Sequence, residues 1–298
     1  MKKKIIDIHN HPNWYGYDHD ALVKNMDEHG IEKTWLLGWE IPENEFNAAP
    51  IYHECMDPRG LCAPLYMVVE GLKKYPDRFI GGWAPDPRDR YARAKLKSAV
   101  KLYNIKVYGE FKLRMRYDNA DALAMFRYCG ELGLPVLIHL ECPPMVLNSM
   151  SKDIYQWSQW YGGDMATVET MCRECPDTAF IGHGPGFWRD ISGDVEQCKE
   201  PYPSGPVTPG GKLIEALRKY SNLHCDLSAG SGANSLERDP EHAKKFVLEF
   251  QDRIMFGRDY FDGRLMNILE KLALPEATMN KVLYQNAERL IENAGKNI

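Results

Sequence analysis

The sequence contains no long apolar run and no block of basic residues. Its 298 residues carry 37 lysine and arginine side chains against 42 aspartate and glutamate side chains, a formal net charge of −5. A membrane-spanning helix needs roughly 18 or more consecutive apolar residues. Binding to nucleic acid or to anionic lipid relies on a basic surface that attracts phosphate. We therefore expect a globular protein that binds neither nucleic acid nor membranes.

Cysteines are also few, at eight in 298 residues. This density is far below that of small disulfide-rich domains. Cys172 and Cys175 form a CxxC pair without the second pair that a structural zinc site needs. The lysines at 2–4 resemble the start of a signal peptide, but Asp7 and His9 stand where its apolar segment belongs. We expect reduced cysteines and a cytoplasmic location, while a leader removed before residue 1 would leave no trace here.

Short runs rich in Ile, Val, Leu and Phe alternate with longer segments of helical pattern. The runs are apolar without clean alternation, as strands buried on both faces are. We predict strands at Lys4–His9, Thr34–Trp39, Phe79–Ala84, Ile105–Phe111, Pro135–Leu140, Thr178–His183, Leu223–Leu227 and Ile254–Asp259. Eight strands alternating with helices predict an α/β protein with a (β/α)8 TIM barrel. The alternative, an open doubly wound sheet of the Rossmann type, lacks its GxGxxG loop after the first strand.

We expect one barrel domain over residues 1–298. Helices are predicted at Tyr91–Leu102, Ala120–Leu132, Pro240–Phe250 and, on the outside or bottom of the barrel, Glu276–Asn293. Long connections are predicted at 40–62, 141–165 and 184–211, each directly after a strand. In a barrel such loops lie at the C-terminal face, where ligands bind. We expect 141–165 and 184–211 to cover the pocket.

Side chains capable of chemistry gather at the predicted strand ends. His9 and His11 end the first strand, and His139, His183 and Asp259 end the fifth, sixth and eighth. The C-terminal ends of all barrel strands meet at one mouth, so these side chains should converge. Residues i and i+2 on a strand point the same way, which lets His9 and His11 bind one ion. Imidazoles with a carboxylate suit Zn²⁺, with Mn²⁺ and Fe²⁺ as alternatives.

Four segments carry a family resemblance: IIDIHNH at 5–11, GLPVLIH at 133–139, FIGHG at 180–184 and FGRDY at 256–260. They resemble the amidohydrolase superfamily, and most of all its amidohydrolase-2 branch of aminocarboxymuconate-semialdehyde decarboxylase, resorcylate-type decarboxylases and lactone hydrolases. The resemblance implies a (β/α)8 barrel with one divalent ion at its mouth. The ligands that it implies are His9, His11, His139 and Asp259. It also implies that His183 stands beside the ion as an acid/base or substrate contact.

Two positions depart from the family pattern. The segment GEFKL at 109–113 matches the fourth strand, but Glu110 stands where an apolar residue is usual. Two-metal members of the wider superfamily carry a carboxylated lysine at the end of this strand. Lys112 is the candidate for that role, so a Lys112-bridged pair of ions stays open beside the one-ion prediction. Arg258 replaces a commoner small residue, and we interpret it as part of the pocket wall.

Candidate substrate contacts surround this centre. An aromatic rim would suit a flat or cyclic organic substrate, although aromatic side chains serve as often in ordinary packing. An arginine beyond a strand end can bind a carboxylate through paired hydrogen bonds, although a solvated loop charge needs no such role. The weaker candidates for substrate contact are Trp14, Glu110, Lys112, Arg114, Phe187 and Trp188.

Three functions are open, and each takes a small molecule as partner. The leading prediction is metal-dependent hydrolysis of a small cyclic or aromatic ester, amide or lactone. In it a metal-activated water attacks, Asp259 accepts its proton, and His183 holds the oxyanion or shuttles protons. The alternative is non-oxidative decarboxylation of an aromatic or enoic acid at the same ion. The third is a catalytically silent barrel that binds a metal or ligand. A homo-oligomer is left open.

Overall fold

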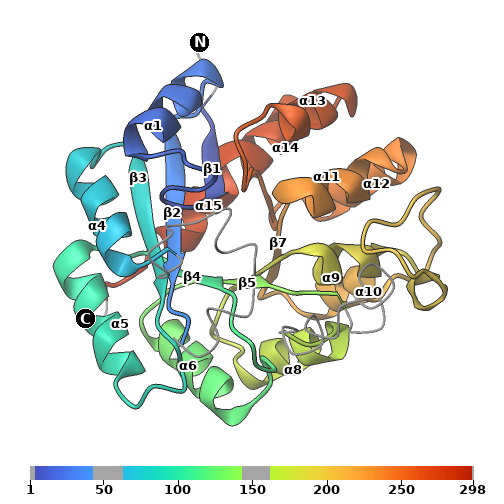
Figure 1. Cartoon of the computed structure of the whole chain (residues 1–298). Coiled ribbons are helices and arrows are strands. Elements are labelled where there is room, and N and C mark those ends of the chain that lie inside the picture. The colour runs from blue at the N-terminus through green and yellow to red at the C-terminus, as the bar shows by residue number, and fades with distance from the viewer. Residues whose placement is uncertain (1–3, 43–62, 143–161, 297–298) are drawn as a thin grey trace.

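The computed structural model describes residues 4–42, 63–142 and 162–296, where parallel strands alternate with helices (Figure 1). Each strand lies on one of the predicted runs. The strands are β1 (Ile6–Asn10), β2 (Lys33–Trp39), β3 (Phe79–Ala84), β4 (Tyr108–Phe111), β5 (Val136–His139), β6 (Phe180–His183), β7 (Leu223–Asp226) and β8 (Ile254–Met255). The apolar runs therefore located the sheet because burial on both faces leaves few polar positions in such strands.

Helices cover the outer side of the strands (Figure 1). They are α1 (His19–Glu28), α4 (Leu65–Lys74), α5 (Ala92–Tyr103), α6 (Ala120–Glu131), α8 (Met165–Glu174), α10 (Lys212–Lys219), α11 (Ala229–Glu237), α12 (Pro240–Glu249) and α13 (Arg264–Lys271). Local capping begins several of them. The Asn119 side chain accepts from the Ala122 amide at the start of α6, and Pro240 follows the Asp239 cap of α12.

The eight strands surround one apolar interior. Their ladders form two sheets, β1-β2-β3 and β4-β5-β6-β7-β8. Backbone hydrogen bonds connect the sheets: Trp83 N donates to Val107 O at 3.0 Å between β3 and β4, and Ile8 N donates to Phe256 O at 3.0 Å beside β8. Inside lies a cluster of Ile6, Ile8, Trp35, Leu37, Val107, Leu137, Ile181, Met255 and Ala287. The predicted (β/α)8 fold is confirmed.

The C-terminal segment closes the bottom of the barrel. The helix predicted at Glu276–Asn293 is divided into α14 (Glu276–Asn280), a π-helical turn η4 (Lys281–Gln285) and α15 (Asn286–Ile291). Asn286 Nδ2 donates to Ile254 O at 2.8 Å, at the first residue of β8. Lys4, which precedes β1, pairs with Glu288 at 2.7 Å. Both contacts lie at the starting ends of strands, opposite the mouth.

The eighth strand is shorter than predicted. It ends at Met255, and Asp259 lies in the following loop with φ of 51°. Asp259 N donates to His9 O at 2.8 Å, which ties this loop to β1. A Cβ at Gly257 would come within 2.5 Å of Asp226 Oδ1, so glycine permits the loop to approach β7. Tertiary contacts rather than the strand ladder therefore position Asp259.

Two of the predicted connections fall largely outside the described residues, which omit 43–62 and 143–161. The third, 184–211, contains a short helix α9 (Pro185–Trp188) and 3₁₀ turns η2 (Arg189–Ile191) and η3 (Val195–Gln197), so it is more ordered than a plain loop. Its predicted role as a cover over the pocket stays a prediction, as does the single-domain extent. None of the helices in the described ranges has the length and apolar character of a membrane span.

Candidate metal centre

Two histidines at the end of β1 begin a buried cluster. His9 Nδ1 lies 2.7 Å from Asp226 Oδ2, and His11 Nδ1 lies 3.0 Å from Leu37 O. A carboxylate or carbonyl oxygen only accepts, so each Nδ1 carries a proton, and Nε2 is the nitrogen of each ring that can bind a cation once it is deprotonated. The two Nε2 atoms are 3.2 Å apart. The structure thus brings together the pair that the i, i+2 spacing predicted.

Glu110, on β4, lies among four histidines. Its Oε2 is 3.6 Å from His11 Nε2, and its Oε1 is 3.7 Å from His9 Nε2. The same Oε1 lies 3.0 Å from His139 Nδ1 and 4.0 Å from His183 Nε2. The Glu110 side chain is 1% exposed. Glu110 entered the sequence prediction only as a weaker substrate contact, yet it lies at the centre of the predicted ligands.

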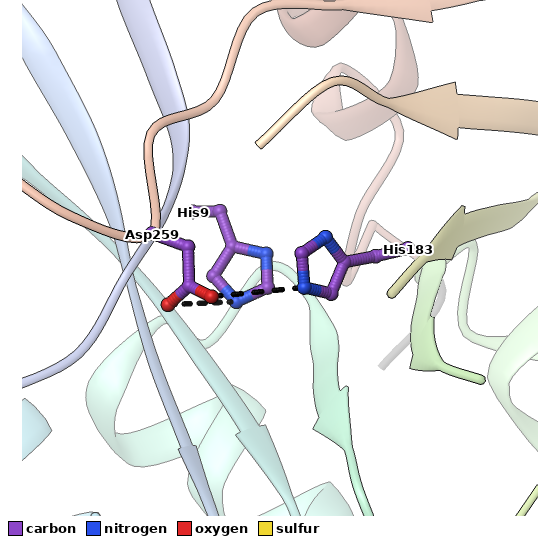
Figure 2. Close-up of side chains that lie close together, drawn as sticks. All are labelled: His9, His183 and Asp259. Atoms are coloured by element: carbon purple, nitrogen blue, oxygen red, sulfur yellow. Dashed lines mark ion pairs between the residues drawn. The ribbon is translucent and has the colours of Figure 1, made fainter. Parts of the chain in front are cut away.

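The Asp259 carboxylate faces the same histidines from the loop after β8. Its Oδ1 is 3.4 Å from His11 Nε2 and 3.8 Å from His9 Nε2, while its Oδ2 is 3.7 Å from His183 Nε2. Figure 2 shows His9, His183 and Asp259 pointing toward one another from three different parts of the chain. The residues predicted at separate strand ends therefore meet at one point.

Asp226 and Ser228, at the end of β7 and just beyond it, position His183 and were missed by the sequence reasoning. Ser228 Oγ donates to Asp226 Oδ2 at 2.7 Å. His183 Nδ1 lies 2.9 Å from Ser228 Oγ and 3.3 Å from Asp226 Oδ2. Because Asp226 only accepts, the proton belongs on His183 Nδ1, and Nε2 presents a lone pair to the cluster. The position of Asp226 at a predicted strand end was the signal that could have found it.

Burial and neighbouring charges together set the pKa values of the histidines. Burial lowers the pKa of His9, but the carboxylates of Asp259 and Asp226 outweigh burial and raise this pKa to about 9. Burial and the neighbouring His9 charge both lower the pKa of His183, which keeps it neutral. A neutral imidazole is the form that binds a metal ion.

The two carboxylates at the centre stay ionised despite burial. Burial raises the pKa of Glu110, but the charge of Lys112 and the hydrogen bond with His139 hold this pKa well below its usual range. Burial likewise raises the pKa of Asp259, but the charge of His9 acts against burial, and the Asp259 pKa lies below its usual value. Both side chains are therefore anionic at neutral pH.

The residues fit a divalent ion. In the described part of the chain, Glu110 Oε2 and Asp259 Oδ1 are buried without a hydrogen-bond partner. A buried acceptor left in this state costs about 1–3 kcal/mol, and more when it is charged. Ligand atoms lie within 4.8 Å of one another in three sets, namely His9–His183–Asp259, His9–His11–Glu110 and Glu110–His139–His183. Such nitrogen and oxygen sets suit Zn²⁺, Mn²⁺ or Fe²⁺.

Of the weaker candidates, Trp14 and Lys112 lie near the cluster. The Trp14 ring is 5.2 Å from that of His11, and its Nε1 donates to Asp259 O at 3.0 Å. Lys112 Nζ lies 5.9 Å from the Trp39 ring centroid, and its charge acts on Glu110. Arg114 is partly buried, and its Nη2 has no hydrogen-bond partner among the described residues. A substrate-binding role for these three stays a prediction.

Phe187 and Trp188 are buried in the main core. The Phe187 ring packs on β6 so closely that a Cβ at Gly182 would come within 2.1 Å of it. Trp188 Nε1 donates to Asp226 O at 2.9 Å and so supports the end of β7. Packing, the alternative that the sequence left open, accounts for both side chains.

Arg258 is buried and forms an ion pair behind the cluster, which replaces its interpretation as a pocket wall. Its Nε donates to Asp7 Oδ2 at 2.9 Å, its backbone N donates to Asp7 Oδ1 at 2.8 Å, and its Nη1 donates to Asn25 Oδ1 at 2.7 Å. The partner is 251 positions away in the chain. Arg258 therefore fixes the loop that carries Asp259.

Comparison with solved structures supports the fold. An uncharacterized TIM-barrel protein from Bordetella bronchiseptica is 18% identical, with 98% of this chain and 99% of that chain covered and a TM-score of 0.61. A dihydroxybenzoic acid decarboxylase from a Polaromonas species, solved with manganese and the inhibitor 2-nitroresorcinol, is 16% identical, with 99% and 98% covered and a TM-score of 0.56.

A probable 2-pyrone-4,6-dicarboxylic acid hydrolase from Acinetobacter baumannii is 13% identical, with 98% of this chain and 100% of that chain covered and a TM-score of 0.57. Comparison with curated proteins gives no significant match. The family model described as amidohydrolase, in its second branch, matches residues 6–292. This match covers nearly all of the chain, including every residue of the cluster. The chain belongs to the amidohydrolase-2 family of enzymes.

Proposed function

We propose that the chain is a metal-dependent hydrolase of a small cyclic or aromatic ester, amide or lactone. The observation that carries the proposal is the Asp259 carboxylate. It is 14% exposed, stays ionised, and has an oxygen, Oδ1, without a hydrogen-bond partner among the described residues. A divalent ion held beside it supplies two effects, a lower pKa for water and polarisation of a carbonyl group.

Asp259 is suited to accept the proton of the attacking water. Its low pKa keeps the carboxylate charged at neutral pH, and Oδ1 lies 3.4 Å from His11 Nε2, beside the ligand atoms. A positioned base of this kind contributes about 10²–10⁴-fold to a rate. The loop geometry holds it there through the hydrogen bond from Asp259 N to His9 O.

His183 contributes a lone pair rather than a proton. Its Nδ1 lies within hydrogen-bond reach of Ser228 and Asp226, so its Nε2 can accept a proton or bind a cation. In this form it cannot donate to an oxyanion. The hydrogen-bond pattern therefore supports His183 as a base or a metal ligand. It does not support His183 as a hydrogen-bond donor to an oxyanion.

The test is an assay of the Mn²⁺- and Zn²⁺-loaded protein against lactones, aryl esters and amides, with Asp259→Asn as the variant. We expect turnover lowered by about 10²–10⁴-fold in this variant. Asp262→Asn is the matched control, because Asp262 lies exposed on the same loop. Full activity of Asp259→Asn would remove Asp259 from the role of base.

Decarboxylation of an aromatic acid is the second candidate, and the Polaromonas structure supports it through its manganese and its dihydroxybenzoic acid activity. Incubation with phenolic acids separates the two functions. Release of CO₂ without uptake of water would replace hydrolysis by decarboxylation. No turnover of any substrate in either panel would favour a barrel that only binds a metal or ligand.

A further inference from the structure

We propose that the chain binds a small aromatic ammonium ion in a cavity of about 480 Å³ beside β2 and β3. The cavity lies where these two strands end and where α4 and α5 begin, and its lining residues include Trp39, Trp83, Leu65 and Lys95. Its volume falls within the range of about 300–1,000 Å³ that is usual for small-molecule sites. The site is additional to the metal centre, so the inference does not depend on the proposed hydrolase function.

The strand positions beside the cavity face the helices rather than the barrel interior. A Cβ at Gly38 would come within 3.0 Å of the Val68 side chain on α4, and a Cβ at Gly81 within 2.7 Å of Leu72 on the same helix. Trp83 lies two residues beyond Gly81 on β3 and therefore points to the same side. Both α4 and α5 contact β3 from outside the barrel (Figure 1). The cavity therefore lies on the opposite side of the strands from the apolar interior.

Aromatic rings supply much of the apolar wall. Trp39 lines the cavity, and its ring centroid is 5.0 Å from that of His11, so this indole separates the cavity from the metal centre. Trp83 is 4% exposed, and its Nε1 has no hydrogen-bond partner among the described residues. A buried N–H without a partner is unfavourable, and an oxygen atom of a bound molecule would satisfy it. These walls favour a flat ligand that carries a hydrogen-bond acceptor.

Carboxylates outnumber cations at the polar side of the cavity. Glu40, Asp86 and Asp89 line it together with Lys95. Lys95 Nζ lies 3.1 Å from Glu40 Oε1 and 2.6 Å from Asp89 Oδ2, while Arg88 Nη2 lies 2.9 Å from Asp86 Oδ2. Three carboxylates thus share two cations, and the side chains of Glu40 and Asp89 are each 30% exposed. An ammonium group would balance the remaining negative charge, and the faces of the indole rings attract the same group.

The first experiment measures the binding of tyramine to the unaltered, Zn²⁺-loaded protein by titration calorimetry. Tyramine combines a flat ring, an ammonium group and a phenol oxygen, and two analogues each remove one of these features. Tyrosol, which has a hydroxyl in place of the ammonium group, should bind at least about tenfold more weakly, and phenethylamine, which lacks the phenol oxygen, about 2–10-fold more weakly. Equal binding of tyramine and tyrosol, or no binding of tyramine at millimolar concentration, would overturn the proposal.

Variants then locate the bound tyramine. Glu40→Gln removes a carboxylate of the cavity and should weaken tyramine binding about tenfold. Glu70→Gln is the matched control, because Glu70 is an exposed carboxylate on α4 that does not line the cavity. Tyr66→Ala is a second test that leaves the ion pairs in place, since Tyr66 lines the cavity and is 40% exposed. It should also weaken binding, and unchanged affinity in both cavity variants would remove the site.

The same titration separates the cavity from the metal centre, whose carboxylates also attract an amine. Tyramine should bind Asp259→Asn as tightly as it binds the unaltered protein. Loss of binding in Asp259→Asn, with binding kept in Glu40→Gln, would place tyramine at the metal centre and overturn the proposal. Tyramine binding without turnover of any ester, amide or lactone would leave this site standing and contradict the hydrolase function. Turnover without tyramine binding would do the reverse.

Discussion

Two buried charged clusters of the barrel share strand β1 and differ in how far their polar atoms are satisfied. In the first, both oxygens of Asp7 accept hydrogen bonds from Arg258, whose guanidinium also reaches Asn25. In the second, which contains His9 two residues further along, Glu110 Oε2 and Asp259 Oδ1 have no hydrogen-bond partner among the described residues. Both clusters are largely buried, but they differ in whether every carboxylate oxygen accepts a hydrogen bond.

The difference separates a structural ion pair from a binding site. A buried carboxylate whose two oxygens both accept hydrogen bonds within the chain, as those of Asp7 do, has no need of a ligand, although Arg258 Nη2 has no hydrogen-bond partner among the described residues. A buried carboxylate that lies among imidazoles and has an oxygen without a hydrogen-bond partner is suited to bind a cation from outside the chain. Substitutions in the Asp7 cluster should therefore act on stability, and substitutions in the Glu110 cluster should act on metal content and turnover.

The largest effect is expected for His183→Asn. Turnover should fall by about 10²–10⁴-fold, or about 3–5 kcal/mol of barrier, because a positioned imidazole is removed. Metal content and the melting temperature should change little, because the family resemblance places this imidazole beside the ion rather than among its ligands. Turnover, metal content and melting temperature are measured on the same preparation. Loss of the metal would instead make His183 a ligand, and lowered stability with activity kept would make it a structural residue.

A loss of stability is expected for Arg258→Met. Removing Arg258 leaves the Asp7 carboxyl buried and unpaired, which should lower the free energy of unfolding by about 3–5 kcal/mol. Denaturant unfolding of the metal-free protein measures this change. The double variant Asp7→Asn/Arg258→Met should recover much of the loss, since the buried charge is gone. A single variant as stable as the unaltered protein would contradict the comparison.

A smaller effect is expected for Ser228→Ala, because Ser228 supports a histidine of the Glu110 cluster from behind. Ser228 Oγ lies 2.9 Å from His183 Nδ1, so Ser228→Ala should loosen this imidazole. Loss of such a support lowers metal affinity about 10–100-fold, which titration calorimetry can measure. Ser231→Ala is the control, because Ser231 is buried on α11 and its Oγ has no partner among the described residues. Equal affinities in the two variants would remove Ser228 from this role.

The last prediction concerns Asp190, a largely buried carboxylate outside both clusters. Burial raises its pKa from 3.8 to about 6, with Lys212 only partly opposing this shift. Since the folded pKa lies above the unfolded value, the stability from this group is present below pH 3.8 and is lost as pH rises through 6. The free energy of unfolding of Asp190→Asn should equal that of the unaltered protein near pH 4. At pH 7 it should exceed that of the unaltered protein by up to about 2–3 kcal/mol. Denaturant unfolding at both pH values checks this, and a constant difference would contradict it.

Much of the fold followed from local sequence. Buried parallel strands need continuous apolar runs, so all eight strands were predicted close to their observed positions. The helix predicted at 120–132 coincides with α6, and the structure shows that Asn119 caps its start by accepting from the Ala122 amide. The convergence of His9, His11, His139 and His183 followed as well, because a barrel collects the C-terminal ends of its strands at one mouth.

The tertiary structure alone decided which side chains face the cluster and which pack behind it. Asp259 lies beyond β8, held by a hydrogen bond to His9 O, and Arg258 finds its partner Asp7 at the other end of the chain. Phe187 packs on β6 instead of bordering the mouth. Strand propensity depends on neighbours a few residues away. The direction of each side chain at the mouth depends on loop path and on contacts up to 251 residues distant, which no local pattern records.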